Sequence, residues 1–314
     1  MKTVCENVHD ALSLHRVVAP DHAKLLQELS RLSGSRDKHR FPGSNPCSLE
    51  RADFPKLRQQ PYFVCEKTNG VRFLMLCCTH DDKRVCAIVD RAMAVYLLPL
   101  QAVPTAAFQG SVIDCELAFN KVDKQWQLLV FDAYVVCGVP MFHKPFSHRM
   151  GAVRRAMEAY AHVPGDPVPL KLKSFLPTTM FRSYRELEVS ARAFFDIDGL
   201  ILTPELSHAA IGRHTELFKL KTRHTIDFLV GPGGREACVF DPSTKAHQPV
   251  ASLRVPQQPG AIVECLRASD GLWDVVCVRR DKATANDVLT YQKTLLNMEE
   301  SITYDELQSF FETI

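Results

Sequence analysis

A lysine at the end of an apolar run is the first residue of this sequence that could do covalent chemistry. Lys67 lies in the segment Glu66-Lys67-Thr68-Asn69-Gly70-Val71-Arg72, between two apolar runs. Asn-Gly is typical of a two-residue hairpin turn, so the simplest interpretation is a hairpin with a solvated lysine. The alternative is an amine nucleophile, because a cation such as Arg72 nearby favours the neutral form of the amine.

Two further basic clusters are candidates for phosphate binding. Lys219 and Lys221 are two residues apart in a strand-like run, so both side chains lie on one face of the strand. Like charges side by side repel, and a phosphate between them would remove that repulsion. The other cluster, Arg279-Arg280-Asp281-Lys282, follows another strand-like run, and on its own it is typical of a charged turn.

Carboxylates inside apolar runs form two closely spaced pairs. Asp114 and Glu116 make up the first pair, and Asp196 and Asp198 make up the second. A buried carboxylate without a partner is costly, so each should have a cation, a metal or a hydroxyl beside it. A structural salt bridge would explain any one of them. Two pairs that each share a strand face, in a chain with paired lysines, indicate a site for phosphate and a divalent metal.

Short strands and a few helices must position these residues. Apolar residues at helical spacing after Asp21, ending before Gly34, predict a helix over 21–32. Residues 33–61 have no period and predict a loop. Strands are predicted at 62–65, 71–78, 85–89, 94–98, 112–119, 126–136, 199–203 and 217–220, and helices at 146–160 and 183–193. The turn residues between the runs favour antiparallel sheets with flanking helices, an α+β domain.

A second domain is predicted after Gly231-Pro232-Gly233-Gly234. Strands at 237–240, 250–255, 261–266 and 273–279 fit a small barrel such as an OB-fold. Helices are predicted at 286–298 and 304–311. The expected division is a first domain over 1–228, a barrel domain over 229–302 and a C-terminal helix over 303–314.

Composition limits the classes of protein to consider. The 314 residues include 38 Lys and Arg against 36 Asp and Glu, so no basic field covers the whole molecule and any nucleic-acid contact must be local. The eleven cysteines lie mostly in apolar runs without a C-x-x-C pair, which indicates reduced thiols in a reducing compartment. Charges interrupt every apolar run before it could span a membrane, and residues 1–7 lack an apolar targeting stretch. We therefore expect a soluble, intracellular, globular protein with no membrane partner.

Several segments also follow one another in the order of a known family. They are Phe41-Pro42-Gly43-Ser44-Asn45-Pro46-Cys47-Ser48, Lys67-Thr68-Asn69-Gly70-Val71-Arg72, Asp114-Cys115-Glu116-Leu117, Phe131-Asp132-Ala133, Lys171-Leu172-Lys173, Asp198-Gly199-Leu200-Ile201, Lys219-Leu220-Lys221, and Trp273 with Arg279-Arg280-Asp281-Lys282. They resemble the FPGSxPVS, KxDGxR, DGEL, FDA, basic, DGLI, KxK and W…RxDK motifs of mRNA capping enzyme guanylyltransferases. That family belongs to the covalent nucleotidyltransferase superfamily, which also contains DNA and RNA ligases. The resemblance implies a nucleotidyltransferase domain followed by an OB-fold domain, with residues 225–228 as the hinge between them.

The resemblance also implies roles for individual residues. Lys67 would take up GMP from GTP as a phosphoramidate. The nucleotide would be bound by Arg72, Glu116, Phe131, Lys173, Ile201, Lys219, Lys221, Arg279, Asp281 and Lys282. Phe131 and Ile201 would flank the base, and Lys173 would reach the guanine oxygen. A divalent cation, magnesium or manganese, would lie near Glu116 and Asp198.

The implied activity is transfer of GMP from GTP, through lysyl-GMP, to the 5′-diphosphate end of RNA, as in mRNA cap formation. Two residues depart from the motifs: Asn69 replaces the aspartate of KxDGxR, and Cys115 replaces the glycine of DGEL. Two alternatives stay open. One is an ATP-dependent polynucleotide ligase, and the other is a catalytically silent scaffold that binds nucleotide.

Expected partners follow from the same resemblance. The sequence has no His-Cys dipeptide of a cysteine phosphatase, and its first 60 residues are too few for a further catalytic domain. A separate RNA triphosphatase is therefore expected to prepare the RNA end. Binding to the tail of RNA polymerase II stays open. The expected location is the nucleus, or the cytoplasm if the chain is viral.

Overall fold

The computed structural model describes residues 12, 14–280 and 282–313, and these form two compact units. The larger unit contains the described residues up to Cys47, together with 53–220 and 305–313. The smaller unit contains 48–52 and the described residues of 221–304. The chain passes from the larger to the smaller unit between Leu220 and Lys221.

The larger unit contains two sheets. One has seven strands: β5 (Val95–Leu97), β4 (Lys83–Val89), β3 (Val71–His80), β6 (Ser111–Asn120), β7 (Gln125–Val136) and β8 (Val139–Pro140) lie in that order, and β9 (Leu170–Leu172) pairs parallel with β7. The other has five: β1 (Ser44–Ser48), β12 (Gly212–Lys221), β11 (Ile197–Pro204), β2 (Tyr62–Thr68) and β10 (Leu176–Pro177). Apart from β9, the pairings in the seven-stranded sheet are antiparallel, as predicted.

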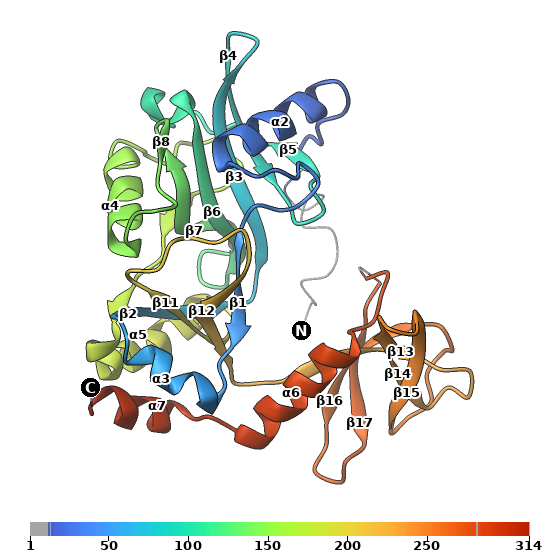
Figure 1. Cartoon of the computed structure of the whole chain (residues 1–314). Helices are drawn as coiled ribbons and strands as arrows, with labels where there is room; N and C mark the ends of the chain where they lie inside the picture. The colour runs from blue at the N-terminus through green and yellow to red at the C-terminus, as the bar shows by residue number, and fades with distance from the viewer. Residues whose placement is uncertain (1–11, 13, 281, 314) are drawn as a thin grey trace. The chain divides into compact units, whose positions relative to one another are not determined.

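The seven-stranded sheet is covered on both faces. Alternate residues of β3, such as Phe73 and Leu74, enter two separate apolar clusters, because successive side chains of a strand point to opposite faces. Helix α4 (Phe146–Ala156) packs on the face of Phe73, and α2 (Asp21–Ser33) packs on the face of Leu74. Figure 1 shows the two helices on opposite sides of the sheet. The predicted helix over 21–32 is confirmed as α2, and Gly34 ends it in the left-handed conformation (φ 67°).

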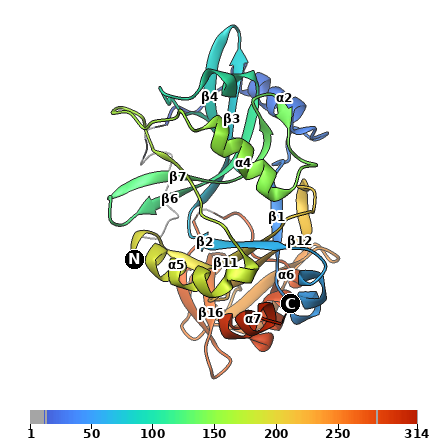
Figure 2. The same ribbon diagram turned by 90° about the vertical axis from the view of Figure 1, so that its left-hand side faces the viewer.

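The five-stranded sheet is covered by α5 (Phe181–Phe194), seen along β2 and β11 in Figure 2. Phe181 at the start of α5 is buried and lies 5.3 Å, between ring centroids, from Phe311 of α7 (Tyr304–Phe311). Both helices were predicted from the sequence. No helix in the described part of the chain is long and apolar enough to cross a bilayer.

The prediction of a loop over 33–61 is wrong for part of that segment. It contains β1, a 3-10 turn (η1, Arg51–Asp53) and the short helix α3 (Phe54–Leu57). β1 has the sequence Ser-Asn-Pro-Cys-Ser, with no apolar alternation to identify it. Proline is tolerated in β1 because this strand lies at the edge of its sheet.

The smaller unit is built on a five-stranded antiparallel sheet. Its order is β15 (Ala246–Ser252), β14 (Glu236–Asp241), β13 (Thr225–Val230), β16 (Ile262–Arg267) and β17 (Trp273–Val278), and α6 (Val288–Glu300) adds residues to its core. β13 occupies the centre of the sheet, and residues 225–228, where the resemblance implies a hinge, lie in this strand. The predicted closed OB-fold barrel is not confirmed. Within the described residues, β15 and β17 are the two edges, and a single bridge between Leu253 and Trp273 links their ends.

Candidate functional site

The segment around Lys67 connects the two sheets of the larger unit. Lys67 is the last residue but one of β2, which pairs with β11 and β10, whereas Arg72 lies on β3, which pairs with β4 and β6. The hairpin interpretation of Asn69-Gly70 is therefore wrong. A Cβ at Gly70 would lie 2.5 Å from the backbone oxygen of Leu117, so only glycine lets this connection pass so close to β6.

Lys67 is paired with Asp198. The Lys67 Nζ lies 2.7 and 3.0 Å from the two carboxylate oxygens, and both side chains are about a quarter exposed. Ile197 pairs with Thr68 and Gly199 pairs with Lys67, so Asp198 is the extra residue of a β-bulge. Bulges redirect side chains and are common beside active sites. The counterion of Lys67 therefore comes from β11, and the exposed Asn69 is not needed for that role.

A second cation lies deeper in the site. Lys173 Nζ donates to Thr68 Oγ1 at 2.8 Å, to the Glu66 backbone oxygen at 3.1 Å and to Glu116 Oε2 at 3.2 Å. Its side chain is only 4% exposed. Burial alone would lower the pKa of Lys173, but Glu116 and neighbouring groups outweigh it, so this pKa is raised. Lys173 therefore keeps its proton and acts as a cationic donor rather than as a nucleophile.

Arg72 is fixed by a buried carboxylate. Its Nε donates to Asp114 Oδ1 at 2.8 Å, its Nη2 donates to the other oxygen, and the Tyr134 hydroxyl donates to that same oxygen. Burial opposes the charge on Arg72, but the pairing with Asp114 prevails and raises the arginine pKa. Arg72 is therefore a permanent cation with a fixed orientation.

An aromatic ring lies between the two cationic side chains. The centroid of Phe131 is 5.5 Å from the guanidinium carbon of Arg72 and 5.9 Å from Lys173 Nζ. Phe131 is also a bulge residue, because Val130 pairs with Cys115 and Asp132 pairs with Asp114. Its half-buried ring offers a stacking surface for a base, and cations near the ring favour that contact.

The segment 41–48, which resembles the FPGSxPVS motif, covers the Arg72 end of the site. The Phe41 ring centroid lies 5.2 Å from the guanidinium carbon of Arg72, and the Ser44 backbone N–H donates to the Tyr134 hydroxyl at 3.0 Å. A Cβ at Gly43 would lie 2.6 Å from Arg72 Nη2. The glycine of this segment thus lets the backbone close over the guanidinium.

The two acidic pairs do not act as pairs. Asp114 binds Arg72, whereas Glu116 binds Thr68 and Lys173. Asp196 precedes β11, and its carboxylate lies 3.1 Å from Lys121 Nζ, so the prediction that it shares a strand face with Asp198 is wrong.

Among the described residues, Asp21, His80 and Asp81 bring three ligand atoms close enough together to hold one metal ion, and none of them is a predicted metal ligand. Glu116 and Asp198 each bring carboxylate oxygens, which are ligands that magnesium and manganese prefer.

The remaining predicted residues lie on several strands. Ile201 is half-buried on β11 opposite Cys65, and Lys219 and Lys221 lie near the end of β12. In the smaller unit, Arg279 Nη1 is 3.0 Å from Asp227 Oδ1, and Lys282 pairs with the other oxygen of the same carboxylate. Asp281 lies outside the described residues.

Sequence reasoning missed several side chains at the site. Thr68 stands inside a motif, but nothing in the local pattern shows that it joins Glu116 to Lys173. The sequence places Tyr134 in a predicted apolar strand and indicates no role for its hydroxyl. Cys115, by contrast, lies in the core on the face of Phe73, so this departure from the motif does not enter the site.

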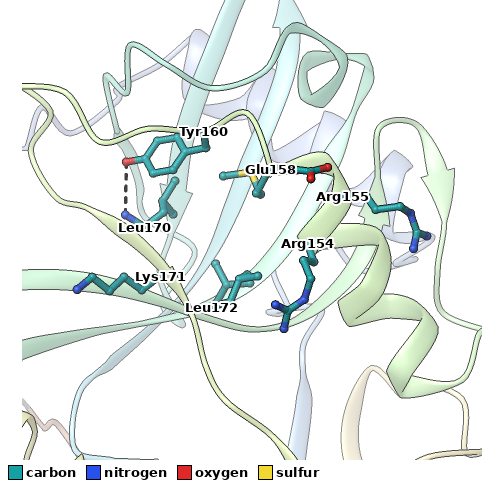
Figure 3. Close-up of a pocket in the computed structure, with 9 residues that line it drawn as sticks. Arg154, Arg155, Glu158, Tyr160, Leu170, Lys171 and Leu172 are labelled. Atoms are coloured by element: carbon teal, nitrogen blue, oxygen red, sulfur yellow. Dashed lines mark hydrogen bonds between the residues drawn. The ribbon is translucent and has the colours of Figure 1, made fainter.

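A separate pocket of about 350 Å³ lies on the face that carries α4, and Figure 3 shows its lining residues. Arg154, Arg155, Tyr160 and Lys171 contribute polar groups, and the Leu170 N–H donates to the Tyr160 hydroxyl at 3.4 Å. None of the predicted site residues lines this pocket. Val130, which does, precedes Phe131 and belongs to the apolar cluster on the face of Phe73.

Comparison with known proteins gives two family matches. The model described as mRNA capping enzyme, catalytic domain, matches residues 10–223, and the model described as mRNA capping enzyme, C-terminal domain, matches residues 220–308. The two matches overlap where the compact units divide along the chain. Together they span almost the whole sequence.

Relatives carry names that agree with these matches. A Neurospora crassa protein named mRNA-capping enzyme subunit alpha is 24% identical over 91% of this chain and 87% of its own length. A Schizosaccharomyces pombe protein of the same name is 24% identical over 95% of this chain and 87% of its own length. Among solved structures, mycobacterial DNA ligase D complexed with ATP and MES has a TM-score of 0.46 at 12% identity, covering 76% of this chain and 95% of that one.

Proposed function

The chain belongs to the mRNA capping enzyme family and is an enzyme of mRNA cap formation, and from this premise we propose that Lys67 carries GMP from GTP to the 5′ end of RNA. The observation that supports Lys67 most directly is its pairing with Asp198 at the connection between the two sheets. Phe131, Lys173 and Arg72 lie close together in the same unit. A lysine amine near a stacking ring and two cationic donors suits covalent capture of a nucleotide.

In the first half-reaction, the neutral amine of Lys67 attacks the α-phosphorus of GTP. A P–N bond forms, the P–O bond to the β-phosphate breaks, and pyrophosphate leaves with the electron pair. Lys67 must lose its proton before the attack, and Asp198 is within hydrogen-bond distance to accept it.

In the second half-reaction, an oxygen of the terminal phosphate of 5′-diphosphate RNA attacks the same phosphorus. A P–O bond forms, the P–N bond breaks, and the lysine nitrogen takes up a proton. The products are capped RNA and free Lys67. Atoms and charge balance without a redox partner.

We assign the nucleotide contacts as the family resemblance implies. The base stacks on Phe131, with Ile201 on its other face, and the Lys173 ammonium donates to the guanine oxygen. Arg72, Lys219 and Lys221 offset phosphate charge. Arg279 and Lys282 of the smaller unit would orient the leaving pyrophosphate, for which both must exchange the Asp227 carboxylate for phosphate oxygens.

Glu116 and Asp198 would hold a divalent cation, magnesium or manganese, because their carboxylates supply the oxygen ligands that these ions prefer. When bound, the ion would offset negative charge on the phosphates.

Partners and location extend the same proposal. Relatives named subunit alpha support a partner subunit, which we assign to a separate RNA triphosphatase. We place the protein in the nucleus, and a fluorescent fusion tests this. Binding to the tail of RNA polymerase II is testable by capture on a phosphorylated tail peptide.

Incubation with GTP labelled at the α-phosphate, followed by denaturing electrophoresis, tests the central step. A covalent label is expected with GTP, but not with ATP and not in Lys67→Ala. Lys171→Ala, which removes an exposed lysine, should keep the label. Tight GTP binding without a label would contradict the proposal and favour a silent scaffold, and labelling by ATP alone would favour a ligase.

A further inference from the structure

A histidine and two aspartates outside the candidate site bring their ligand atoms together at one end of the seven-stranded sheet. His80 is the last residue of β3, Asp81 lies in the turn to β4, and Asp21 begins α2. One carboxylate oxygen of each aspartate and a ring nitrogen of the histidine all lie within 4.8 Å of one another. Because Asp21 is distant from the other two in the sequence, it is the fold that assembles this group.

The distances within the group are too long for hydrogen bonds and close to those between metal ligands. His80 Nε2 lies 3.7 Å from Asp21 Oδ1 and 3.6 Å from Asp81 Oδ2. A hydrogen bond between nitrogen and oxygen spans about 2.7–3.2 Å. Two ligands that each lie about 2.0–2.1 Å from one tetrahedral zinc ion are about 3.4 Å apart. Both aspartates are exposed, so small rotations of their side chains bring the three atoms to this spacing.

The histidine nitrogen of this group lacks a hydrogen bond. His80 Nε2 is buried, and none of the described residues forms a hydrogen bond with it. Buried polar atoms normally have a partner, and one without a partner points to a bound water or ion. The groups that this nitrogen faces are the two carboxylates. A cation between the nitrogen and the two oxygens would satisfy all three and offset the repulsion between the carboxylates.

Neighbouring residues hold Asp81 in place. Lys24 of α2 donates to Asp81 Oδ2 at 3.0 Å. A carboxylate oxygen has two lone pairs, so Asp81 can keep this hydrogen bond while it binds an ion, and metal-bound carboxylates are commonly held by such a second contact. Asp81 and Asp82 both have positive φ (45° and 59°), as in a tight two-residue hairpin turn. The turn therefore fixes the backbone of Asp81 directly after His80.

We propose that Asp21, His80 and Asp81 form a zinc site that ties α2 to the turn between β3 and β4. Imidazole is a ligand that suits zinc, whereas magnesium prefers oxygen ligands alone. Three protein ligands leave a fourth position for water. Helix α2 covers the face of the sheet that carries Leu74, so the ion stabilises that packing. The site is independent of the proposed function and of the divalent cation assigned to the nucleotide.

Titration calorimetry with zinc chloride tests the site on the metal-free full-length protein at neutral pH, with magnesium in excess. Wild type is expected to bind one zinc ion whose affinity falls by at least about tenfold in Asp21→Asn and in His80→Gln. Asp82→Asn is the matched control, because it removes a carboxylate of the same turn that is not one of the three ligands. It should bind zinc as wild type does. Equal zinc binding by all four proteins, or no binding by wild type, overturns the site.

Thermal unfolding with and without zinc gives a second readout. An ion that binds only the folded chain raises the melting temperature. The increase is expected in wild type and in Asp82→Asn, and it should be lost in Asp21→Asn and in His80→Gln. An increase that persists in both ligand variants places the ion elsewhere. If zinc changes the melting temperature of none of the four proteins, His80 is only an ion-pair partner of the two aspartates, and the zinc site is wrong.

Discussion

Asp198 is the extra residue of a β-bulge, and its carboxylate lies 2.7 Å from the ammonium of Lys67 on the neighbouring strand. A regular strand would pair residue 198 in register with β2, as Gly199 pairs with Lys67. The bulge shifts the register at Asp198, and its side chain reaches the lysine. The pair thus depends on a defect in the sheet as much as on the two side chains.

Asp198→Asn is expected to reduce the rate of covalent labelling by at least about a hundredfold, the scale of a lost proton acceptor. The matched control is Asp196→Asn, two residues earlier, which removes only an exposed ion pair with Lys121. Labelling by this control should stay within about fivefold of wild type. Equal losses in both variants would show that Asp198 has no special relationship with Lys67.

Asn69→Asp restores the residue found in the family motif. Because Asn69 is exposed and Asp198 already supplies the counterion of Lys67, a second carboxylate should change the labelling rate by no more than about fivefold. Initial labelling rates at saturating GTP measure the effect. A large gain would mean that the natural asparagine limits the enzyme.

The sequence predicted the strands of this site far better than the directions of its side chains. Strand periodicity and turn residues identify β3, β6 and β7, because each depends on local sequence. Phe131, Tyr134 and Asp198 are all bulge residues, and a bulge is defined by the register of the partner strand. Strand periodicity also predicts that Asp114 and Glu116 act together. In the structure, Asp114 binds Arg72 and Glu116 binds Lys173.

Pairing between strands that are far apart in the sequence explains the other differences between the predicted and the observed fold. β1 lacks an apolar pattern and exists because β12 lies beside it. The Asn-Gly pair resembles a hairpin locally, yet its two strands find different partners. Closure of the smaller sheet into a barrel depends in the same way on pairing between its first and last strands, which no local window contains.

A pH dependence of stability is expected from His214. Its Nδ1 accepts the backbone N–H groups of Glu216 and Leu217 at 3.2 Å, so the folded state needs this nitrogen unprotonated. Burial lowers the pKa of His214. The unfolded chain therefore binds a proton that the folded chain does not, and the free energy of unfolding should fall as pH decreases below about 6.5. Urea unfolding from pH 7.5 to 5 measures this, and His214→Gln should have a shallower slope; parallel slopes would contradict it.

Gly70→Ala tests whether the close passage of the connection holds the site together. The new Cβ would meet the Leu117 backbone oxygen at 2.5 Å, and it would lie 2.7 Å from the Cγ of Glu116. Because backbone cannot rotate away, the variant should lose about 1–3 kcal/mol of stability, and labelling should fall as Glu116 is displaced. Gly151→Ala in α4 is the control, since its nearest neighbour is the end of the Arg155 side chain at 3.4 Å and alanine favours a helix by up to about 1 kcal/mol. Chemical unfolding and the labelling rate are measured on both variants. A Gly70→Ala protein with wild-type stability and labelling would show that the connection can move away from β6, so that Glu116 is not held by this contact.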